Sequence, residues 1–192
     1  MIAAIVPAHD EAEHIGACVQ SLQVAAQSLK LRGEAVTVVV VADHCHDDTA
    51  AIARQAGAVV LTVAARNVGS ARAAGAQFAL DAGARWLAFT DADSVVDADW
   101  LAAQLELGSD AVCGTVAVRH WGNYDAQLQQ HHEFIYTDAD GHQHIHGANL
   151  GVSAQAYRRA GGFQPLQTSE DVALVDAPRN SGARIAWSAR PR

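Results

Sequence analysis

Two aspartates separated by one residue, Asp91 and Asp93, directly follow the segment LAFT at 87–90. On an extended or gently turning chain this spacing points both carboxylates to the same side. Two hard oxygen donors suit Mg²⁺ or Mn²⁺, which proteins often hold through one or two carboxylates while substrate phosphates complete the shell. A solvated turn with a helix-capping role is the alternative, because so short a motif often matches by chance. The pair therefore predicts a divalent cation that bridges the protein and a diphosphate.

Polar residues also follow the other three strands expected in the first half of the chain. They occupy segments 8–11, 43–48 and 66–67, and the first two are acidic. In open parallel sheets, ligands bind beyond the carboxyl ends of the strands, so these segments are expected to share one rim. Like charges so close repel one another, and a bound cation is the simplest way to keep them ionised.

The elements that position these residues alternate between apolar runs and helical patterns. Strands are expected at 2–6, 36–41, 59–63 and 86–90, and helices at 15–29, 49–56 and 70–82. Asp48 is the expected cap of the second helix. This rhythm predicts an α/β fold with a mostly parallel central sheet and helices on both faces.

The pattern loosens after Asp97. Helices are expected at 98–107, 123–136 and 153–161, a further helix opens at Ser169 or Glu170, and strands are expected at 111–118 and 185–187. We therefore expect a single domain, residues 1–192, with a nucleotide-binding half at 1–96 and an acceptor-binding half at 97–192.

Composition narrows the function classes. Of the 192 residues half are hydrophobic and 18% are charged, which excludes a disordered tail. The net charge of -8 disfavours nucleic acid as a partner, because no counterion release would favour binding. No apolar run approaches membrane-spanning length, and the apolar start is too short for a signal peptide. Three dispersed cysteines indicate free thiols in a reducing cytoplasm, while peripheral contact with a membrane or a second copy stays open.

Six segments, in order, resemble the family-two glycosyltransferases of the GT-A fold, a Rossmann-like nucleotide-diphospho-sugar transferase fold. IVPAHDE resembles the first strand and its P-x-x-N-E ending, with Asp10 in place of the usual Asn, and ADHCHDDT resembles D-x-S-x-D-x-T. RNVGSARAAG, FTDADS, HGANLGVSAQAYRRAGGF and SEDVAL resemble the four later blocks of the family. Each match is modest, but six in the family's order are a strong signal.

The resemblance implies roles for residues of the first half. The nucleotide-binding residues would be Pro7, Ala8, Glu11, Asp43, Arg66, Arg72 and Asp91. Asp43 would hydrogen-bond the nucleobase, and Arg72 would lie near the diphosphate or base. Backbone N–H groups at the start of that helix, near Gly69 and Ser70, would add to the site. Turn-capping and solvated helix positions are the structural alternatives.

For the second half, the resemblance implies that Asp171 is the general base of an inverting transfer, with Glu170 as the fallback. Acids are favoured in a first helical turn in any case, so a structural role is the alternative. The metal ligands would be Asp93, Asp91 and His146, because a late histidine completes the shell in some GT-A enzymes. Gly147, Ala148, Asn149 and His144 would contact the donor or the acceptor.

Two histidines in these sets belong to a crowded region that contains His131, His132, His142, His144 and His146. His144 and His146 would share one side of a strand. A zinc site is the competing reading, but the cysteines supply no partner spacing for it.

Other classes fit less well. A sugar-phosphate nucleotidyltransferase needs a Gly-rich, basic phosphate loop near the start, and a dehydrogenase needs G-x-G-x-x-G, and both are absent. A nucleotide-sugar-binding module without transferase activity stays open, because the chain stops soon after its last strand, where family members continue into a closing segment. Uridine and guanosine donors are both expected for the family. The acceptor can be a small metabolite, a lipid carrier or a glycan.

Overall fold

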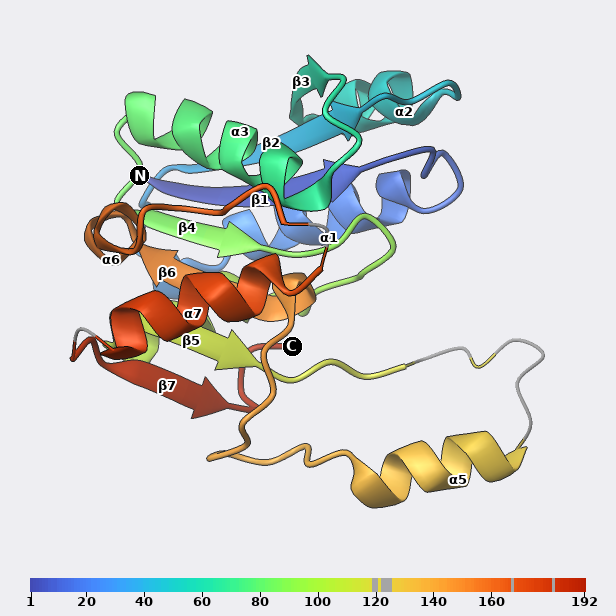
Figure 1. Cartoon of the computed structure of the whole chain (residues 1–192). Helices are drawn as coiled ribbons and strands as arrows, with labels where there is room; N and C mark the ends of the chain where they lie inside the picture. The colour runs from blue at the N-terminus through green and yellow to red at the C-terminus, as the bar shows by residue number, and fades with distance from the viewer. Residues whose placement is uncertain (119–120, 122–125, 167, 181) are drawn as a thin grey trace.

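The computed structural model describes residues 1–118, 121, 126–166, 168–180 and 182–192 (Figure 1). Within these ranges the chain forms one seven-stranded sheet in the order β3-β2-β1-β4-β6-β5-β7. The strands are β1 (Ile2–Ala8), β2 (Val36–Asp43), β3 (Val59–Val63), β4 (Trp86–Phe89), β5 (Ala111–Gly114), β6 (Leu150–Ser153) and β7 (Ile185–Ser188).

The sheet is parallel except at one strand. Strands β3, β2, β1 and β4 pair in parallel, and β5 pairs in parallel with β7. Only β6, among the described strands, runs antiparallel to its neighbours, β4 and β5. The predicted α/β class with a mostly parallel sheet is therefore confirmed, and β6 is an element that the sequence pattern did not predict.

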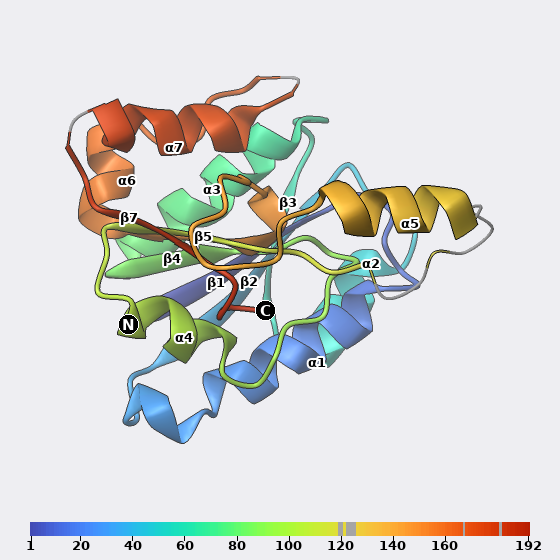
Figure 2. The ribbon, with the colours of Figure 1, turned by 90° about the horizontal axis from the view of Figure 1, so that it is seen from below.

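Helices cover both faces of the sheet. They are α1 (Ile15–Ala26), α2 (Thr49–Gln55), α3 (Val68–Asp81), α4 (Trp100–Glu106), α5 (Ala126–Ile135), α6 (Ala154–Ala160) and α7 (Glu170–Asn180), with short 3₁₀ turns η1 (Leu29–Leu31) and η2 (Gly147–Asn149). Figure 2 shows α3, α6 and α7 on one face and α1 and α4 on the other, whereas α5 lies apart from these layers. In the described residues no helix is both long and apolar enough to span a membrane.

The central strand explains why both faces are covered. Ile2, Ala4 and Val6 pack with α1 and α4 in one hydrophobic core. Ala3 and Ile5 point the other way and pack with α3, α6 and α7 in the second core. An uninterrupted apolar strand therefore requires a helical layer on each side, as in other parallel sheets.

Several local boundaries differ from the predictions; helix α1, for example, ends at Ala26 instead of 29. Helix α3 starts at Val68 because the Asn67 side chain caps it, accepting a hydrogen bond from the Ser70 N–H at 2.8 Å. Asp48 occupies the predicted N-cap position of α2 but makes no side-chain cap bond, and Oδ1 of Asp47 accepts from the Thr49 N–H instead. Strand β5 ends at Gly114, four residues before the expected end at 118, where no partner strand continues in the described ladder.

Candidate active site

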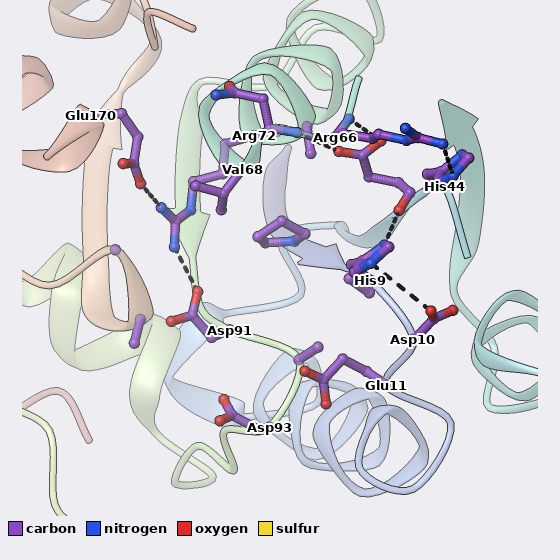
Figure 3. A pocket seen from close by; sticks show the side chains of 18 of the residues that line it. His9, Asp10, Glu11, His44, Arg66, Val68, Arg72, Asp91, Asp93 and Glu170 are labelled. Carbon is purple, nitrogen blue, oxygen red and sulfur yellow. Dashed lines mark hydrogen bonds and ion pairs between the residues drawn. The ribbon is translucent and has the colours of Figure 1, made fainter. Parts of the chain in front are cut away.

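A cavity of about 980 Å³ opens at the carboxyl ends of β1, β2 and β4. It lies where the strand order reverses between β1 and β4, which is the expected ligand position in an open α/β sheet. Its volume is at the upper end of the range for small-molecule sites. Figure 3 shows carboxylates, imidazoles and guanidinium groups converging on it.

Thirteen of the residues predicted for the site line this cavity together. They are Pro7, Ala8, Glu11, Asp43, Arg66, Arg72, Asp91, Asp93, His146, Gly147, Ala148, Glu170 and Asp171. The first eight come from residues 1–96 and the last five from the second half. The two halves of the chain therefore build one site.

Arg72 lies at the centre of an ionic chain that crosses the cavity wall. Its guanidinium donates to Oδ1 of Asp91 at 2.6 Å and to the carboxylate of Glu170 (Figure 3). The Arg72 and Glu170 side chains are only 5% and 7% exposed, whereas Asp91 is 40% exposed. The buried Arg72 guanidinium thus neutralises the buried carboxylate of Glu170. It also orients the carboxylate of Asp91, which reaches the cavity.

Two neighbours fix this guanidinium. The Phe163 ring lies beneath it, 5.7 Å from its central carbon to the ring centroid. The backbone of Gly147 lies so close that a Cβ atom there would overlap the guanidinium. The predicted contact of Arg72 with the diphosphate or base stays a prediction, but in this arrangement Arg72 acts first as a positioning residue for Asp91.

The two aspartates of the 91–93 motif differ in their surroundings. Asp91 is held by Arg72, whereas Asp93 is exposed and accepts no hydrogen bond or ion pair from any described residue. Figure 3 shows the Asp93 carboxylate beside those of Asp91 and Glu11 at the lower edge of the cavity. Asp93 therefore keeps both oxygens available, and Asp91 keeps one.

The two acidic residues that open α7 also differ. Glu170 is buried against Arg72, so its carboxylate is committed to the ion pair. Asp171 is half-buried, lines the cavity, and accepts hydrogen bonds from the N–H groups of Gly147 and Val172, each at 2.8 Å. Of the two, only Asp171 is placed to meet a ligand.

Asp43 organises the loop after β3. Its Oδ1 accepts from the N–H groups of Ala65 and Arg66 at 2.7 and 2.9 Å, and Oδ2 accepts from that of Asn67 at 2.9 Å. The carboxylate is 5% exposed. The hydrogen bond predicted between Asp43 and a nucleobase stays a prediction. It would use a lone pair of the Asp43 carboxylate that these three bonds leave free. The structure adds a loop-ordering role that the sequence did not reveal.

His146 is the histidine of the crowded region that reaches the cavity. Its Nε2 lies 3.1 Å from the Tyr136 hydroxyl, which also accepts from the Val116 N–H at 2.8 Å. Burial lowers the pKa of His146 below its ordinary value, which favours the neutral imidazole that metals bind. The side chains of His131 and His132 lie outside the described residues.

Two predicted contact residues do not line the cavity. The Asn149 amide is buried, donates to the carbonyls of Thr115 and Pro191, and accepts from the indole of Trp100, each at 2.8 Å. The His144 ring stacks on Tyr136, with 4.3 Å between the ring centroids. The donor and acceptor contacts predicted for Asn149 and His144 therefore have no support in their positions.

Several cavity residues were not singled out by sequence reasoning. They are His9, Asp10, His44, His46, Asn67, Val68, Ala71, Ala92 and Ser169. The first four lie in the polar segments after β1 and β2, whose position was predicted but whose histidines carried no assigned role.

Comparison with known families identifies one family over most of the chain. Residues 3–161 match the profile of Glycosyl transferase family 2. The chain belongs to glycosyltransferase family 2. The match includes β1 to β4, the 91–93 motif and the block from Gly147 to Gly161, so the predicted resemblance is confirmed. Comparison with curated proteins gives no significant match.

Solved structures of glycosyltransferases share the fold of this family 2 chain. TarS of S. aureus superposes with a TM-score of 0.71 at 18% identity, covering 98% of this chain and 35% of that one. The mannosyltransferase PcManGT of Pyrobaculum calidifontis, in complex with GDP-Man and Mn²⁺, gives 0.67 at 18%, covering 100% and 57%. Glucosyl-3-phosphoglycerate synthase of M. tuberculosis gives 0.65 at 17%, covering 99% and 70%.

At these identities the similarity shows the fold alone, and the predicted GT-A fold is confirmed. The chain spans between 35% and 58% of the TarS chains that it matches.

Proposed function

We propose that this chain binds a nucleotide-diphosphate sugar with Mg²⁺ or Mn²⁺ in the cavity and transfers the sugar, with inversion, to an acceptor hydroxyl. One observation carries the proposal: a single cavity is lined by Asp91 and Asp93 at the end of β4 and by Asp171 at the start of α7. Cation ligands and a candidate base thus face the same space from opposite halves of the chain.

The nucleoside end of the donor fits between the ends of β1, β2 and β3. Pro7, Ala8 and Glu11 line one side there, and Asp43 and Arg66 line the other. Solved structures of the same fold contain UDP-GlcNAc in TarS and GDP-Man in the mannosyltransferase. These complexes support uridine and guanosine nucleotides as the donors to test first.

The donor set at the opposite end fits a hard divalent cation. Asp93 offers both carboxylate oxygens, Asp91 offers the one that Arg72 leaves, and His146 offers a neutral imidazole. A cation held there would stabilise negative charge on the departing diphosphate. Arg72 contributes by fixing the rotamer of Asp91, and Asn67 and Val68 at the start of α3 line the same cavity.

Asp171 is the proposed general base. Its hydrogen bond from the Gly147 N–H holds the carboxylate at the cavity surface, where it can accept a proton from an acceptor hydroxyl within hydrogen-bond reach. Glu170 cannot take this role without breaking its ion pair with Arg72. The acceptor oxygen would attack the anomeric carbon from the side opposite the nucleotide, which gives inversion.

The cation assignment is tested by calorimetric titration of UDP- and GDP-sugars with Mn²⁺, and again with a chelator. We expect Asp93→Ala to abolish metal-dependent binding, whereas Asp81→Ala, at the far end of α3, leaves it unchanged. Binding of the metal–nucleotide by Asp93→Ala with native affinity would refute this assignment.

The base assignment is tested by Asp171→Asn. The amide oxygen can still accept from the Gly147 N–H, so we expect folding and donor binding to persist while transfer falls by roughly 10²- to 10⁴-fold. Transfer at the native rate would require another base. Donor binding by the native chain without transfer to any acceptor would favour a nucleotide-sugar-binding module.

A further inference from the structure

A second group of metal-ligating side chains lies at the nucleoside end of the cavity, away from Asp93. His9 and Asp10 follow β1, and Cys45 and His46 follow β2. Two of these four residues depart from the motifs that the segments resemble: Asp10 stands where the family has Asn, and Cys45 where it has Ser. The chain has thus exchanged two neutral polar groups for a carboxylate and a thiol at adjacent positions in space.

Ligand atoms of His9, His46 and Cys45 each lie near Asp10. Its Oδ2 lies 3.9 Å from Nε2 of His9 and 3.5 Å from Nδ1 of His46. Asp10, Cys45 and Asp47 each have a ligand atom within 4.8 Å of the others. A tetrahedral ion with bonds of about 2.0–2.3 Å holds its ligand atoms roughly 3.3–3.7 Å apart. The His9 and His46 side chains are 58% and 66% exposed, so small rotations can close the remaining gaps.

Bonds from outside the group orient two of these ligands. Nδ1 of His9 lies 2.7 Å from the backbone carbonyl of Asp43, and donation to that oxygen leaves the Nε2 lone pair directed toward Asp10. A ring N–H bound to a backbone carbonyl is the usual support of a metal-binding histidine. The other carboxylate oxygen of Asp10, Oδ1, accepts from the His46 N–H at 2.6 Å, and Oδ2 faces the imidazoles of His9 and His46.

The thiol approaches the same loop. Sγ of Cys45 lies 3.4 Å from the carbonyl oxygen of Ala8, two residues before Asp10. Cys45 is half-buried, whereas Cys18 and Cys113 are buried in the two cores. Cys45 is therefore the thiol that can reach a metal at this end of the cavity without disrupting a core.

Neighbouring candidates are already occupied. Nε2 of His44 lies 2.5 Å from Nη2 of Arg66, whose N–H can only donate. Asp47 accepts from the N–H groups of Ala12 and Thr49 through its two oxygens. These contacts leave His9, Asp10, Cys45 and His46 as the ligand set.

We propose that His9, Asp10, Cys45 and His46 form a Zn²⁺ site that joins the loop after β1 to the loop after β2. A mixed set of two imidazoles, one thiolate and one carboxylate suits Zn²⁺, whereas Mg²⁺ and Mn²⁺ prefer oxygen ligands, as at Asp93. Sequence spacing alone gave no zinc pattern, because the ligands come from two loops, with Asp10 and His46 36 residues apart. The site lies at the nucleoside end of the same cavity, and Zn²⁺ binding there requires neither the proposed cation ligands Asp91 and Asp93 nor the proposed base.

The test uses the full chain freed of metal with a chelator and titrated with Co²⁺ as a spectroscopic probe. We expect one Co²⁺ per chain, intense tetrahedral d–d bands, a sulfur-to-cobalt charge-transfer band, and displacement of the Co²⁺ by Zn²⁺. Zn²⁺ affinity is then measured by competition with a chromophoric chelator. The absence of a sulfur-to-cobalt band would overturn the proposal.

Variants separate this site from other causes of metal binding. Cys45→Ser and Asp10→Asn carry the residues of the resembling motifs, and their folding is checked by circular dichroism without metal. We expect Cys45→Ser to lose the charge-transfer band, and each variant to weaken Zn²⁺ binding by more than the 10- to 100-fold typical of outer-shell changes.

Two matched controls, Asp48→Asn and His14→Gln, alter an exposed carboxylate and an exposed imidazole nearby and should bind Zn²⁺ as the native chain does. Asp93→Ala should also retain Zn²⁺, so failure of the donor-site proposal would leave this result unchanged. Equal Zn²⁺ affinity in Cys45→Ser, Asp10→Asn and the native chain would overturn the proposal.

Discussion

Replacing Arg72 with Met removes the cation that lies between Glu170 and Asp91. The methionine side chain fills most of the arginine stem but supplies no hydrogen-bond donor. Glu170 then becomes a carboxylate that is 7% exposed and has lost its ion-pair partner, whereas Asp91, at 40% exposure, can be solvated. The destabilisation should therefore arise mainly from Glu170.

Its magnitude follows from burial. Removing one partner of a buried ion pair costs about 3–5 kcal/mol, because the remaining charge stays desolvated. In a domain of this size each kcal/mol lowers Tm by about 2–4 °C, so Arg72→Met should lose roughly 6–20 °C. Replacing both partners, in Arg72→Met/Glu170→Met, removes the unpaired charge and should recover most of that loss.

The measurement is urea unfolding followed by circular dichroism and extrapolated to water. Arg85→Met is the matched control, because Arg85 bonds Glu34 through Nε and Nη2 at 2.7 and 2.5 Å on the surface, with 56% of its side chain exposed. Such a surface pair contributes at most about 1 kcal/mol. The reasoning is refuted if Arg72→Met costs no more than Arg85→Met, or if the double variant is less stable than Arg72→Met.

Three further predictions concern the same elements. Gly147→Ala places a methyl group against the Arg72 guanidinium, so we expect a loss of about 1–3 kcal/mol in urea unfolding and weaker metal–nucleotide binding; an unchanged affinity would contradict this. Asn149→Ala leaves the Trp100 indole N–H and the carbonyls of Thr115 and Pro191 without this partner. It should lower the free energy of unfolding by about 3 kcal/mol in the same assay while the folded fraction binds donor normally. A loss under 1 kcal/mol would contradict this. Burial raises the pKa of Cys18 and Cys113 to about 12, so below that pH their thiolate fraction rises tenfold per unit of pH. Thiol labelling of the native chain at pH 8 should therefore reach only Cys45, and labelling of all three cysteines without denaturant would contradict the burial.

The first half of the fold could be predicted because each strand is an apolar run closed by polar residues. Strand β3 has the predicted bounds, 59–63, and β1 and β2 extend the predicted runs by two residues each. Strands β1 and β2 are buried over most of their length, so hydrophobicity alone marks them, and the edge strand β3 is marked by its run of β-branched residues. The same regularity located the rim where the polar segments meet.

Strand β6 could not be predicted from its own residues. It is four residues long, includes Gly151, and joins β4 to β5 through antiparallel ladders. Its extended form depends on partners 37 or more residues earlier in the chain, with Leu150 opposite Phe89 and Cys113. Local propensity carries no information about such pairing.

The candidate site could likewise be predicted from the sequence only in part. Residue types at 91–93 and 170–171 predicted carboxylates at the cavity, and the cavity contains all four. The sequence could not indicate which carboxylates are free, because that depends on Arg72, which pairs with a glutamate 98 residues away. Burial and partners, rather than residue type, distinguish Asp93 from Asp91 and Asp171 from Glu170.

The ionic chain also explains why two glycines occur where the halves of the molecule meet. A Cβ atom at Gly69, in the first turn of α3, would overlap the carbonyl oxygen of Gln164, in the segment before α7, and one at Gly147 would overlap the guanidinium of Arg72. These close approaches bring the carboxylate of Asp91, held by Arg72, and the carboxylate of Asp171 onto one cavity. A shift of α7 that displaced Glu170 would release Arg72 and with it the rotamer of Asp91. The proposed cation ligand Asp91 and the proposed base Asp171 are therefore mechanically linked through a single buried arginine.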